Sequence, residues 1–173
     1  MTQISIKLGD ITKENVDCIV NAANAALSGG GGVDGAIHKA SGPLLLEECR
    51  QLGRCAPGEC CITDAYNLPV KRIIHAVGPV WSGGVKNEEA LLSSVYSRSL
   101  ALCNKESLHS IAFPNISCGA YKFPIQLACN IALTTVNDWL ENNANDIHEV
   151  RFICYDPKIL KIFINVQNLM QKH

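Results

Sequence analysis

A run of four glycines that leads into an aspartate is the part of this sequence best equipped for chemistry. The stretch from Ser28 to His38 has the sequence SGGGGVDGAIH, in which Gly29–Gly32 precede Asp34. Glycine lets the backbone approach a ligand closely, and N–H groups that open onto a helix N-terminus bind phosphate or pyrophosphate. A carboxylate at such a place repels the phosphate that the loop attracts. The combination therefore predicts a nucleotide-binding site at which Asp34 takes part in a reaction.

Two further loops contain residues suited to nucleotide binding, and each follows a predicted strand. The first is Gly9-Asp10-Ile11-Thr12, and the second is SCGAYKFP at residues 117–124. A third polar segment, NAAN at residues 21–24, leads into the glycines. Each loop alone is a weak signal, because glycine loops and strand-end aspartates occur in many folds. The contiguous glycines do not form the G-x-G-x-x-G turn of a dinucleotide-binding fold.

Short apolar strands alternate with helical segments along the chain, which predicts an α/β layered fold. Ligands in such folds gather at the carboxyl ends of the strands, where all three loops lie. Asn87 is the expected N-cap of the third helix. No repeat or linker interrupts the pattern, so residues 1–173 are expected to form a single domain. The expected strands are 4–8, 18–20, 60–65, 72–77, 110–113 and 150–155, and the expected helices are 33–40, 44–52, 87–105, 124–142 and 157–171.

The composition is that of a folded protein without an electrostatic preference for nucleic acid. Of 173 residues, 47% are apolar and 18% are charged, and the formal net charge is −1. These values exclude a disordered chain and a general nucleic-acid binder. No apolar run approaches the roughly 20 residues that span a bilayer, and the N-terminus MTQISIKLGD has no apolar signal segment. We therefore expect a cytoplasmic protein that does not engage a membrane, and we expect it to be a monomer.

The nine cysteines are an odd number and include no CxxC pair. Most lie inside apolar runs, so we expect buried, reduced thiols that act as small apolar side chains. The alternative is a zinc site built from Cys49, Cys55, Cys60 and a histidine, but this spacing matches no zinc-finger pattern. We therefore expect neither a metal nor a cofactor.

In their order along the chain, the motifs resemble the macrodomain family and, within it, the MacroD-type ADP-ribose hydrolases. The resembling segments are GDIT, NAAN, GGGGVDGAIH, the pair Gly42-Pro43, IHAVGP at 74–79 and GAYKFP, and together they extend over nearly the whole chain. The resemblance implies a three-layer α/β/α macrodomain, in which helices flank a mixed, mostly parallel sheet of about six strands. It implies ADP-ribose and its esters as ligands, and mono-ADP-ribosylated proteins as partners.

The resemblance also implies a role for individual residues. Asp10 would accept a hydrogen bond from the adenine amine, beside the Ile11 backbone. Asn24 would bind hydroxyls of the distal ribose, and Asp34 would orient or activate the attacking water. Tyr155 would pack against the adenine. The remaining contacts, to the phosphates and the distal ribose, would come from Gly31, Gly32 and Val33 and from Ser117, Gly119, Ala120 and Tyr121, with the Tyr121 ring over the ribose.

Several of these residues have a structural alternative. Asp34 also suits the first turn of a helix, where a carboxylate interacts favourably with the helix dipole. Asn24 and Asp10 also suit turns. Tyr155 closes an apolar run, so it also suits the core.

Two histidines, His38 and His75, lie within the motifs and need a role. His38 follows Asp34 by one helical turn and shares its face, and we expect it to pack or to orient rather than to react. His75 lies in an apolar strand, and we expect a core histidine whose hydrogen bonds are satisfied.

Two positions depart from the family pattern. Lys122 stands where the family usually has a glycine, which puts the flexibility of the loop and the rate in question. Three alternatives are open: the lysine attracts the diphosphate, it narrows the mouth of the site, or it points outward without effect. Ala120 is smaller than the branched residue common at that position, which holds the ribose less tightly.

The reaction that the resemblance implies is hydrolysis of an ester at the distal ribose. The ester is either O-acetyl-ADP-ribose or the link between ADP-ribose and an Asp or Glu side chain of a protein. A water held between a phosphate and Asp34 would attack, with either Asp34 or a substrate phosphate as the base. The alternatives are a reader module that binds ADP-ribose without cleaving it, and an ADP-ribose 1''-phosphate phosphatase that uses the same site.

Overall fold

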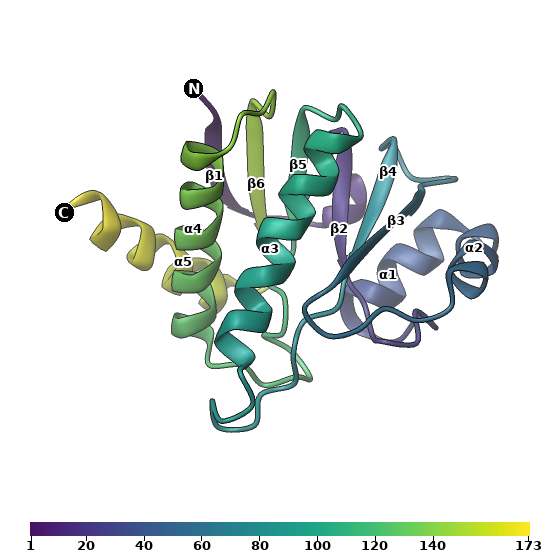
Figure 1. The fold of residues 1–173 in the computed structure, drawn as a ribbon, viewed down its shortest axis with the longest axis horizontal. Helices are drawn as coiled ribbons and strands as arrows, with labels where there is room; N and C mark the ends of the chain where they lie inside the picture. Colours follow the sequence, from purple (N-terminus) through teal and green to yellow (C-terminus); the bar gives the residue numbers. More distant parts are fainter.

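A six-stranded sheet with strand order β1-β6-β5-β2-β4-β3 lies between two layers of helices (Figure 1). The computed structural model describes all 173 residues. Every neighbouring pair of strands is parallel except β3 and β4, which are antiparallel. The prediction of a mixed, mostly parallel sheet of six strands in a three-layer fold is confirmed. The strands are β1 (Gln3–Leu8), β2 (Cys18–Ala22), β3 (Cys60–Asp64), β4 (Arg72–Ala76), β5 (Ser110–Phe113) and β6 (Glu149–Cys154).

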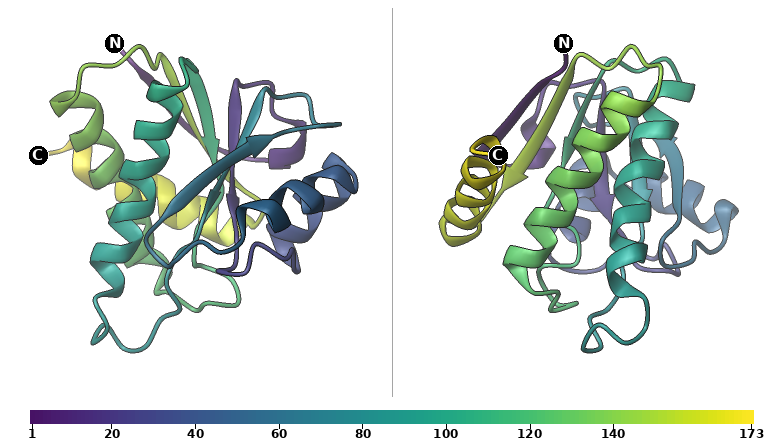
Figure 2. Two further views of the ribbon diagram at one scale, coloured as in Figure 1. Left: turned by 45° about the vertical axis from the view of Figure 1, so that its right-hand side comes forward. Right: turned by 60° about the vertical axis from the view of Figure 1, so that its left-hand side comes forward.

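The helices divide between the two faces of the sheet (Figures 1 and 2). Apolar residues of α3, α4 and α5 share one large core cluster with the sheet, and those of α1 and α2 share a smaller cluster on the other face. A 3₁₀ helix, η1, follows β1. The bounds are η1 (Ile11–Lys13), α1 (Gly32–Ser41), α2 (Leu44–Leu52), α3 (Glu88–Lys105), α4 (Ile125–Asn142) and α5 (Pro157–Gln171).

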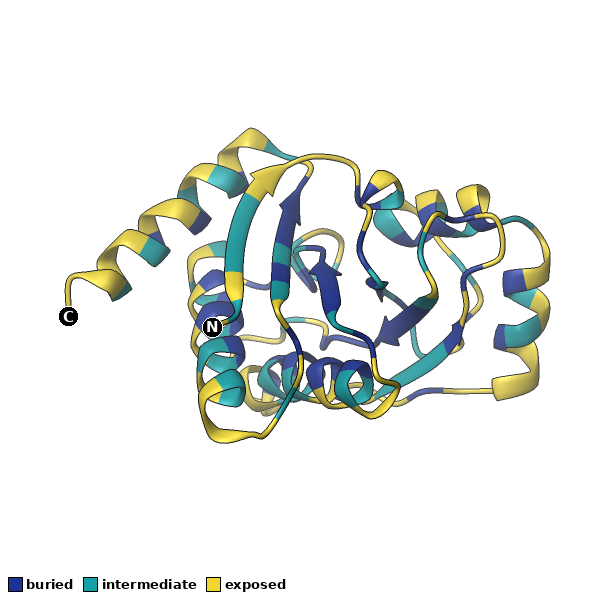
Figure 3. Cartoon of the chain, turned by 90° about the horizontal axis from the view of Figure 1, so that it is seen from above, coloured by how far each residue is buried: buried dark blue, intermediate teal, exposed yellow.

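The central strands are buried on both faces, as their continuous apolar runs predict (Figure 3). Side chains alternate between the faces of a strand, so Ile111 and Phe113 of β5 join the large cluster and Ala112 joins the small one. All five parallel strands end at the same edge of the sheet. The loops that the sequence singles out therefore meet there.

Asn87 is the N-cap residue of α3, as predicted, but its side chain does not cap the helix. Asn87 has a φ of 63° and makes no capping hydrogen bond through its side chain. Instead, the buried carboxylate of Glu88 accepts hydrogen bonds from the backbone N–H groups of Ser82 (3.0 Å), Gly84 (2.7 Å) and Lys86. The first residue of the helix therefore fixes the loop that precedes it.

The expected elements differ from the observed ones by one or two residues at their ends. The difference matters at β6, which ends at Cys154 and leaves Tyr155 outside the strand. The Tyr155 side chain is 65% exposed, so the alternative that placed it in the core is wrong.

All nine cysteines are free thiols, and six of them are buried. Burial raises the pKa of Cys60, Cys118 and Cys129 to about 12, so these thiols stay protonated at neutral pH. No group of three or more His, Cys, Asp or Glu side chains is arranged to hold a metal ion. None of the helices combines the length and the apolar composition that crossing a membrane requires.

Candidate functional site

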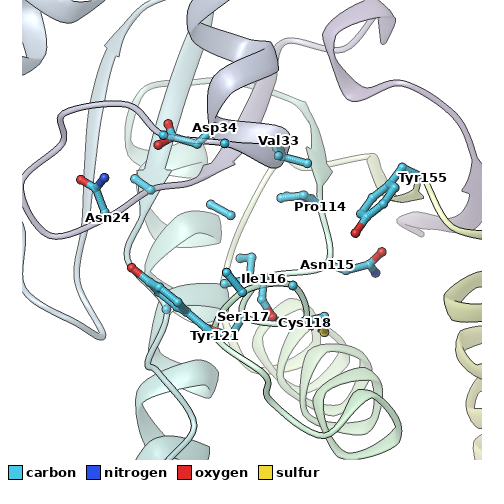
Figure 4. Close-up of a pocket in the computed structure, with 18 of the residues that line it drawn as sticks. Asn24, Val33, Asp34, Pro114, Asn115, Ile116, Ser117, Cys118, Tyr121 and Tyr155 are labelled. Atoms are coloured by element: carbon cyan, nitrogen blue, oxygen red, sulfur yellow. Dashed lines mark hydrogen bonds between the residues drawn. The ribbon is translucent and has the colours of Figure 1, made fainter.

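A cavity of about 400 Å³ opens at the carboxyl ends of β2, β4, β5 and β6 (Figure 4). This size is in the range of small-molecule sites, and the position is where ligands bind in parallel α/β sheets. Asn24, Asp34 and Tyr121 lie toward one end of the cavity, and Asn115 and Tyr155 lie toward the other.

Ten of the twelve site residues predicted from the sequence line this cavity. They come from three separate loops, so the fold brings together segments that lie far apart in the chain. The ten are Asn24, Gly31, Gly32, Val33, Asp34, Ser117, Gly119, Ala120, Tyr121 and Tyr155.

Asp10 and Ile11 do not line the cavity. The Asp10 carboxylate caps η1, where it accepts hydrogen bonds from the backbone N–H (3.0 Å) and the hydroxyl (2.7 Å) of Thr12. These bonds hold the pKa of Asp10 below its usual value, and Ile11 is buried. The turn lies close to the cavity all the same, because the Gly9 N–H donates to the carbonyl oxygen of Cys154, next to Tyr155.

The cavity is also lined by residues to which the sequence analysis gave no role. Gly78 lies two residues after the end of β4, as the predicted loops lie just after their strands, so its position in IHAVGP was the available signal. Asn115 is a polar residue two positions after β5, which is the same kind of signal. The other lining residues outside the prediction are Ala22, Ala23, Gly30, Pro114, Ile116, Cys118 and Ile159.

The amide of Asn24 shapes the glycine loop. Its Nδ2 donates to the carbonyl oxygen of Gly29 (3.0 Å), and its Oδ1 accepts from the backbone N–H of Ser28 (3.1 Å). Gly29 and Gly32 have φ values of 78° and 58°, which L side chains rarely adopt. The loop therefore needs both its glycines and the Asn24 side chain to reach the start of α1.

The Asp34 carboxylate lies in the first turn of α1 and is only 6% exposed. Its Oδ1 accepts a hydrogen bond from Asn21 Nδ2 at 2.8 Å, and His38 Nε2 lies 3.4 Å from the same oxygen. Its Oδ2 accepts no hydrogen bond from the chain and faces Gly30, where a β-carbon would lie 3.4 Å from it. One oxygen of Asp34 is thus held by protein donors, and the other is left for a ligand or a water.

His38 packs against the glycine loop, in line with the expectation that it packs or orients its neighbours rather than reacts. A β-carbon at Gly29 would lie 3.6 Å from the His38 ring. The ring therefore sits between the loop and Asp34, in contact with both.

Backbone hydrogen bonds hold the second loop at both ends. Ser117 has a φ of 64°, and its hydroxyl donates to the carbonyl oxygen of Pro79 at 2.9 Å. The Phe123 N–H donates to the carbonyl oxygen of Ser117 (3.0 Å), and the Trp81 N–H donates to that of Tyr121 (2.9 Å). These bonds tie the loop around Tyr121 to its own first residue and to the segment that follows β4.

Lys122 occupies a left-handed conformation, with a φ of 57°, and its side chain is exposed. A residue with a β-carbon is strained there by about 1–2 kcal/mol. We expect Lys122→Gly to raise the free energy of unfolding by about 1 kcal/mol and Tm by about 2–4 °C. Lys122→Ala keeps the β-carbon and removes only the charge, so it should leave Tm nearly unchanged. Thermal unfolding of the two variants separates strain from charge, and an equal rise in both would contradict the role of strain.

Comparison with known proteins identifies the family. The Macro domain family matches residues 20–132. A Macro domain-containing protein of Listeria monocytogenes is 50% identical over 171 residues, which cover 96% of this chain and 97% of that protein. A protein of Citrobacter koseri named O-acetyl-ADP-ribose deacetylase is 50% identical over 166 residues, which cover 94% and 93% of the two chains.

The fold agrees with a solved member of the same family. The macrodomain of Oceanobacillus iheyensis, solved as a mutant with ADPR, superposes with a TM-score of 0.94 at 38% identity. The superposition covers 99% of this chain and 95% of that one. Sequence and structure thus agree over nearly the full length, and the chain belongs to the Macro domain family.

Proposed function

We propose that this macrodomain binds ADP-ribose in the cavity and hydrolyses esters at its distal ribose. The observation that carries the proposal is Asp34, a nearly buried carboxylate whose Oδ2 faces the cavity beside a glycine loop. Two similarities support it: the Citrobacter relative named O-acetyl-ADP-ribose deacetylase and the Oceanobacillus structure with ADPR. The substrates we propose are O-acetyl-ADP-ribose and proteins that carry mono-ADP-ribose on Asp or Glu.

The ligand would extend along the cavity with its adenine near Tyr155 and its distal ribose near Asp34 (Figure 4). The exposed Tyr155 ring offers an apolar face to the base. Asp10 lies just beyond the end of β1, the strand that pairs with β6, and would accept from the adenine amine. Asn24 and the Tyr121 ring would position the distal ribose. Backbone groups of Gly31, Gly32, Val33, Ser117, Gly119 and Ala120 would surround the diphosphate, and Ile11 would contribute its backbone near the adenine.

The proposed reaction is attack of a water on the ester carbonyl carbon. A bond forms between the water oxygen and that carbon, and the water proton passes to Asp34 Oδ2. The bond between the carbon and the ribose oxygen then breaks, and the ribose oxygen takes up the proton. The products are a free carboxylic acid and ADP-ribose. Fixing the water and the ester in one cavity removes most of the entropic cost of the encounter.

In this proposal residues 1–173 act as one domain, because the two apolar clusters lie on opposite faces of one sheet. We propose that the domain acts as a monomer in the cytoplasm. The site serves small esters and protein esters alike. No metal or cofactor takes part, since a carboxylate base and fixed backbone dipoles are sufficient for ester hydrolysis.

The test is release of ADP-ribose from a protein that carries it on glutamate, beside release of acetate from O-acetyl-ADP-ribose. Arginine-linked and serine-linked proteins serve as controls, because their links are not esters of a carboxylic acid. We expect release from the two acyl esters alone, together with saturable binding of ADP-ribose by calorimetry. Binding without release from any substrate would identify a reader module. Release of phosphate from ADP-ribose 1''-phosphate, with both esters intact, would identify a phosphatase.

A further inference from the structure

Behind Asp34, away from the cavity, three polar side chains cross the sheet without any exposure to solvent. They are Asn21 on β2, His75 on β4 and Thr63 on β3, each 0% exposed. Asn21 Nδ2 lies 2.8 Å from Asp34 Oδ1 and 3.1 Å from His75 Nδ1. His75 Nε2 lies 2.9 Å from Thr63 Oγ1. The result is a continuous chain of hydrogen bonds from the antiparallel strand β3 to the carboxylate at the cavity.

The strand register accounts for this arrangement. Asn21 lies directly opposite His75 in the parallel pair of β2 and β4. Thr63 lies opposite Ile73 in the antiparallel pair of β3 and β4, which places it diagonally from His75 on the same face. A shift of one residue in either pair would turn these side chains to opposite faces.

Only one arrangement of hydrogens satisfies the chain. Burial lowers the pKa of His75 to about 3, so its ring is neutral and has one donor and one acceptor nitrogen. The Thr63 hydroxyl donates its single hydrogen to the carbonyl oxygen of Asp64 (3.0 Å) and therefore accepts from His75 Nε2–H. His75 Nδ1 then carries no hydrogen and accepts from Asn21 Nδ2, whose second hydrogen goes to Asp34 Oδ1.

The neutral imidazole thereby fixes which way the Asn21 amide points. If the amide were turned over, its oxygen would face both the bare Nδ1 of His75 and the carboxylate of Asp34, and two acceptor pairs would repel. The observed orientation leaves Asn21 Oδ1 buried without a partner in the chain. An unpaired buried carbonyl costs about 1–3 kcal/mol, so apolar side chains at these positions would serve stability better. The arrangement is better explained by what it does to Asp34.

We propose that His75 is a positioning residue for the reaction at Asp34. Its Nδ1 carries no hydrogen and therefore orients the Asn21 amide. The amide holds Asp34 Oδ1 and leaves Oδ2 turned to the substrate. The role in catalysis rests on the function proposed above, whereas the hydrogen-bond arrangement does not. His38 approaches the same Oδ1, so both protein contacts converge on one oxygen of the carboxylate. His75 is 54 residues from Asn21 in the chain and does not line the cavity.

The first test is independent of activity. In the wild-type protein labelled with ¹⁵N at histidine, NMR at pH 7 is expected to show His75 as the neutral tautomer with its hydrogen on Nε2. A hydrogen on Nδ1, or a protonated ring, would overturn the proposal, because Asn21 Nδ2 would then have no acceptor there.

The second test uses two substitutions that each keep one end of the imidazole. His75→Asn keeps an acceptor near the position of Nδ1, and His75→Gln keeps a donor near the position of Nε2. We expect kcat for ester hydrolysis to stay within about threefold of wild type in His75→Asn and to fall at least about tenfold in His75→Gln, with the Kd for ADP-ribose unchanged in both. Equal kcat in the two folded variants, or a change in Kd that matches the change in kcat, would overturn the positioning role.

A double-mutant cycle shows whether His75 acts through Asn21. If it does, adding His75→Gln to Asn21→Ala should reduce kcat no further than Asn21→Ala alone. Independent, multiplying effects would overturn the proposed route. Should the wild-type protein bind ADP-ribose but hydrolyse nothing, the proposed function fails while the NMR result still decides the hydrogen-bond arrangement.

Discussion

Replacing Asp34 by asparagine is expected to lower kcat for ester hydrolysis by about a hundredfold to ten-thousandfold, the range that general-base catalysis contributes. Asparagine has nearly the same shape, and its oxygen can still accept from Asn21 Nδ2. The change removes the ability to take a proton from water at the second position of the carboxyl group. It also removes a negative charge near the diphosphate, so the Kd for ADP-ribose should stay within about threefold of wild type or improve. Single-turnover hydrolysis and calorimetric titration measure the two effects separately.

The matched control for this change is Asp138→Asn. Asp138 is an exposed carboxylate on α4, and it lies outside the cavity. The control should leave both kcat and Kd unchanged. Hydrolysis at the wild-type rate by Asp34→Asn would show that Asp34 is not the base, and a phosphate of the substrate would then be the remaining candidate.

Most of the fold was predictable because the local sequence pattern of each element matches the burial of that element in the fold. The runs at residues 18–20 and 111–113 are apolar throughout, and such runs are typical of strands covered on both faces. The bounds of α2 and α5 were predicted to the residue, since a Gly53 stop and a Pro157 start mark their ends. The start of α3 was predicted to within one residue. The hydrogen bonds of Glu88 were not predictable, because its partners are backbone groups of a loop whose shape no local pattern specifies.

Part of the candidate site was likewise predictable from the sequence, and part was not. Loops after parallel strands converge by topology alone, so Asn24, Asp34 and Tyr121 were predictable as neighbours. The environment of Asp34 was not, because Asn21 and His75 meet only through the register of β2 and β4. A sequence shows which residues alternate on a strand, but not which residue of a distant strand lies opposite.

Lys122 was predictable in one respect only. The departure from a family glycine was visible in the sequence, but only the φ of 57° shows why a glycine suits the position. The family pattern at that place is explained by backbone conformation rather than by space for a ligand.

Gly35→Ala is expected to destabilise the protein even though intrinsic helix propensity favours alanine. Gly35 lies within α1, where replacement of glycine by alanine would ordinarily stabilise by about 0.5–1 kcal/mol. Here a β-carbon at Gly35 would lie 2.5 Å from the carbonyl oxygen of Gly30, a backbone atom that cannot rotate away. We expect the free energy of unfolding to fall by about 2 kcal/mol and Tm by about 4–8 °C.

The same clash should slow hydrolysis by about a hundredfold, because Gly30 of the glycine loop and Asp34 of α1 both belong to the site. Gly30 lines the cavity opposite Asp34 Oδ2. If the glycine loop is pushed away from α1, Gly30 therefore moves away from Asp34. A displacement of about 1 Å at a reacting centre costs on the order of a hundredfold in rate. Ala36→Gly, at the exposed neighbouring position, measures helix propensity alone and should cost about 1 kcal/mol with kcat retained. A more stable, fully active Gly35→Ala would show that the glycine loop does not depend on close contact with α1, and the position of Gly30 beside Asp34 would then need another explanation.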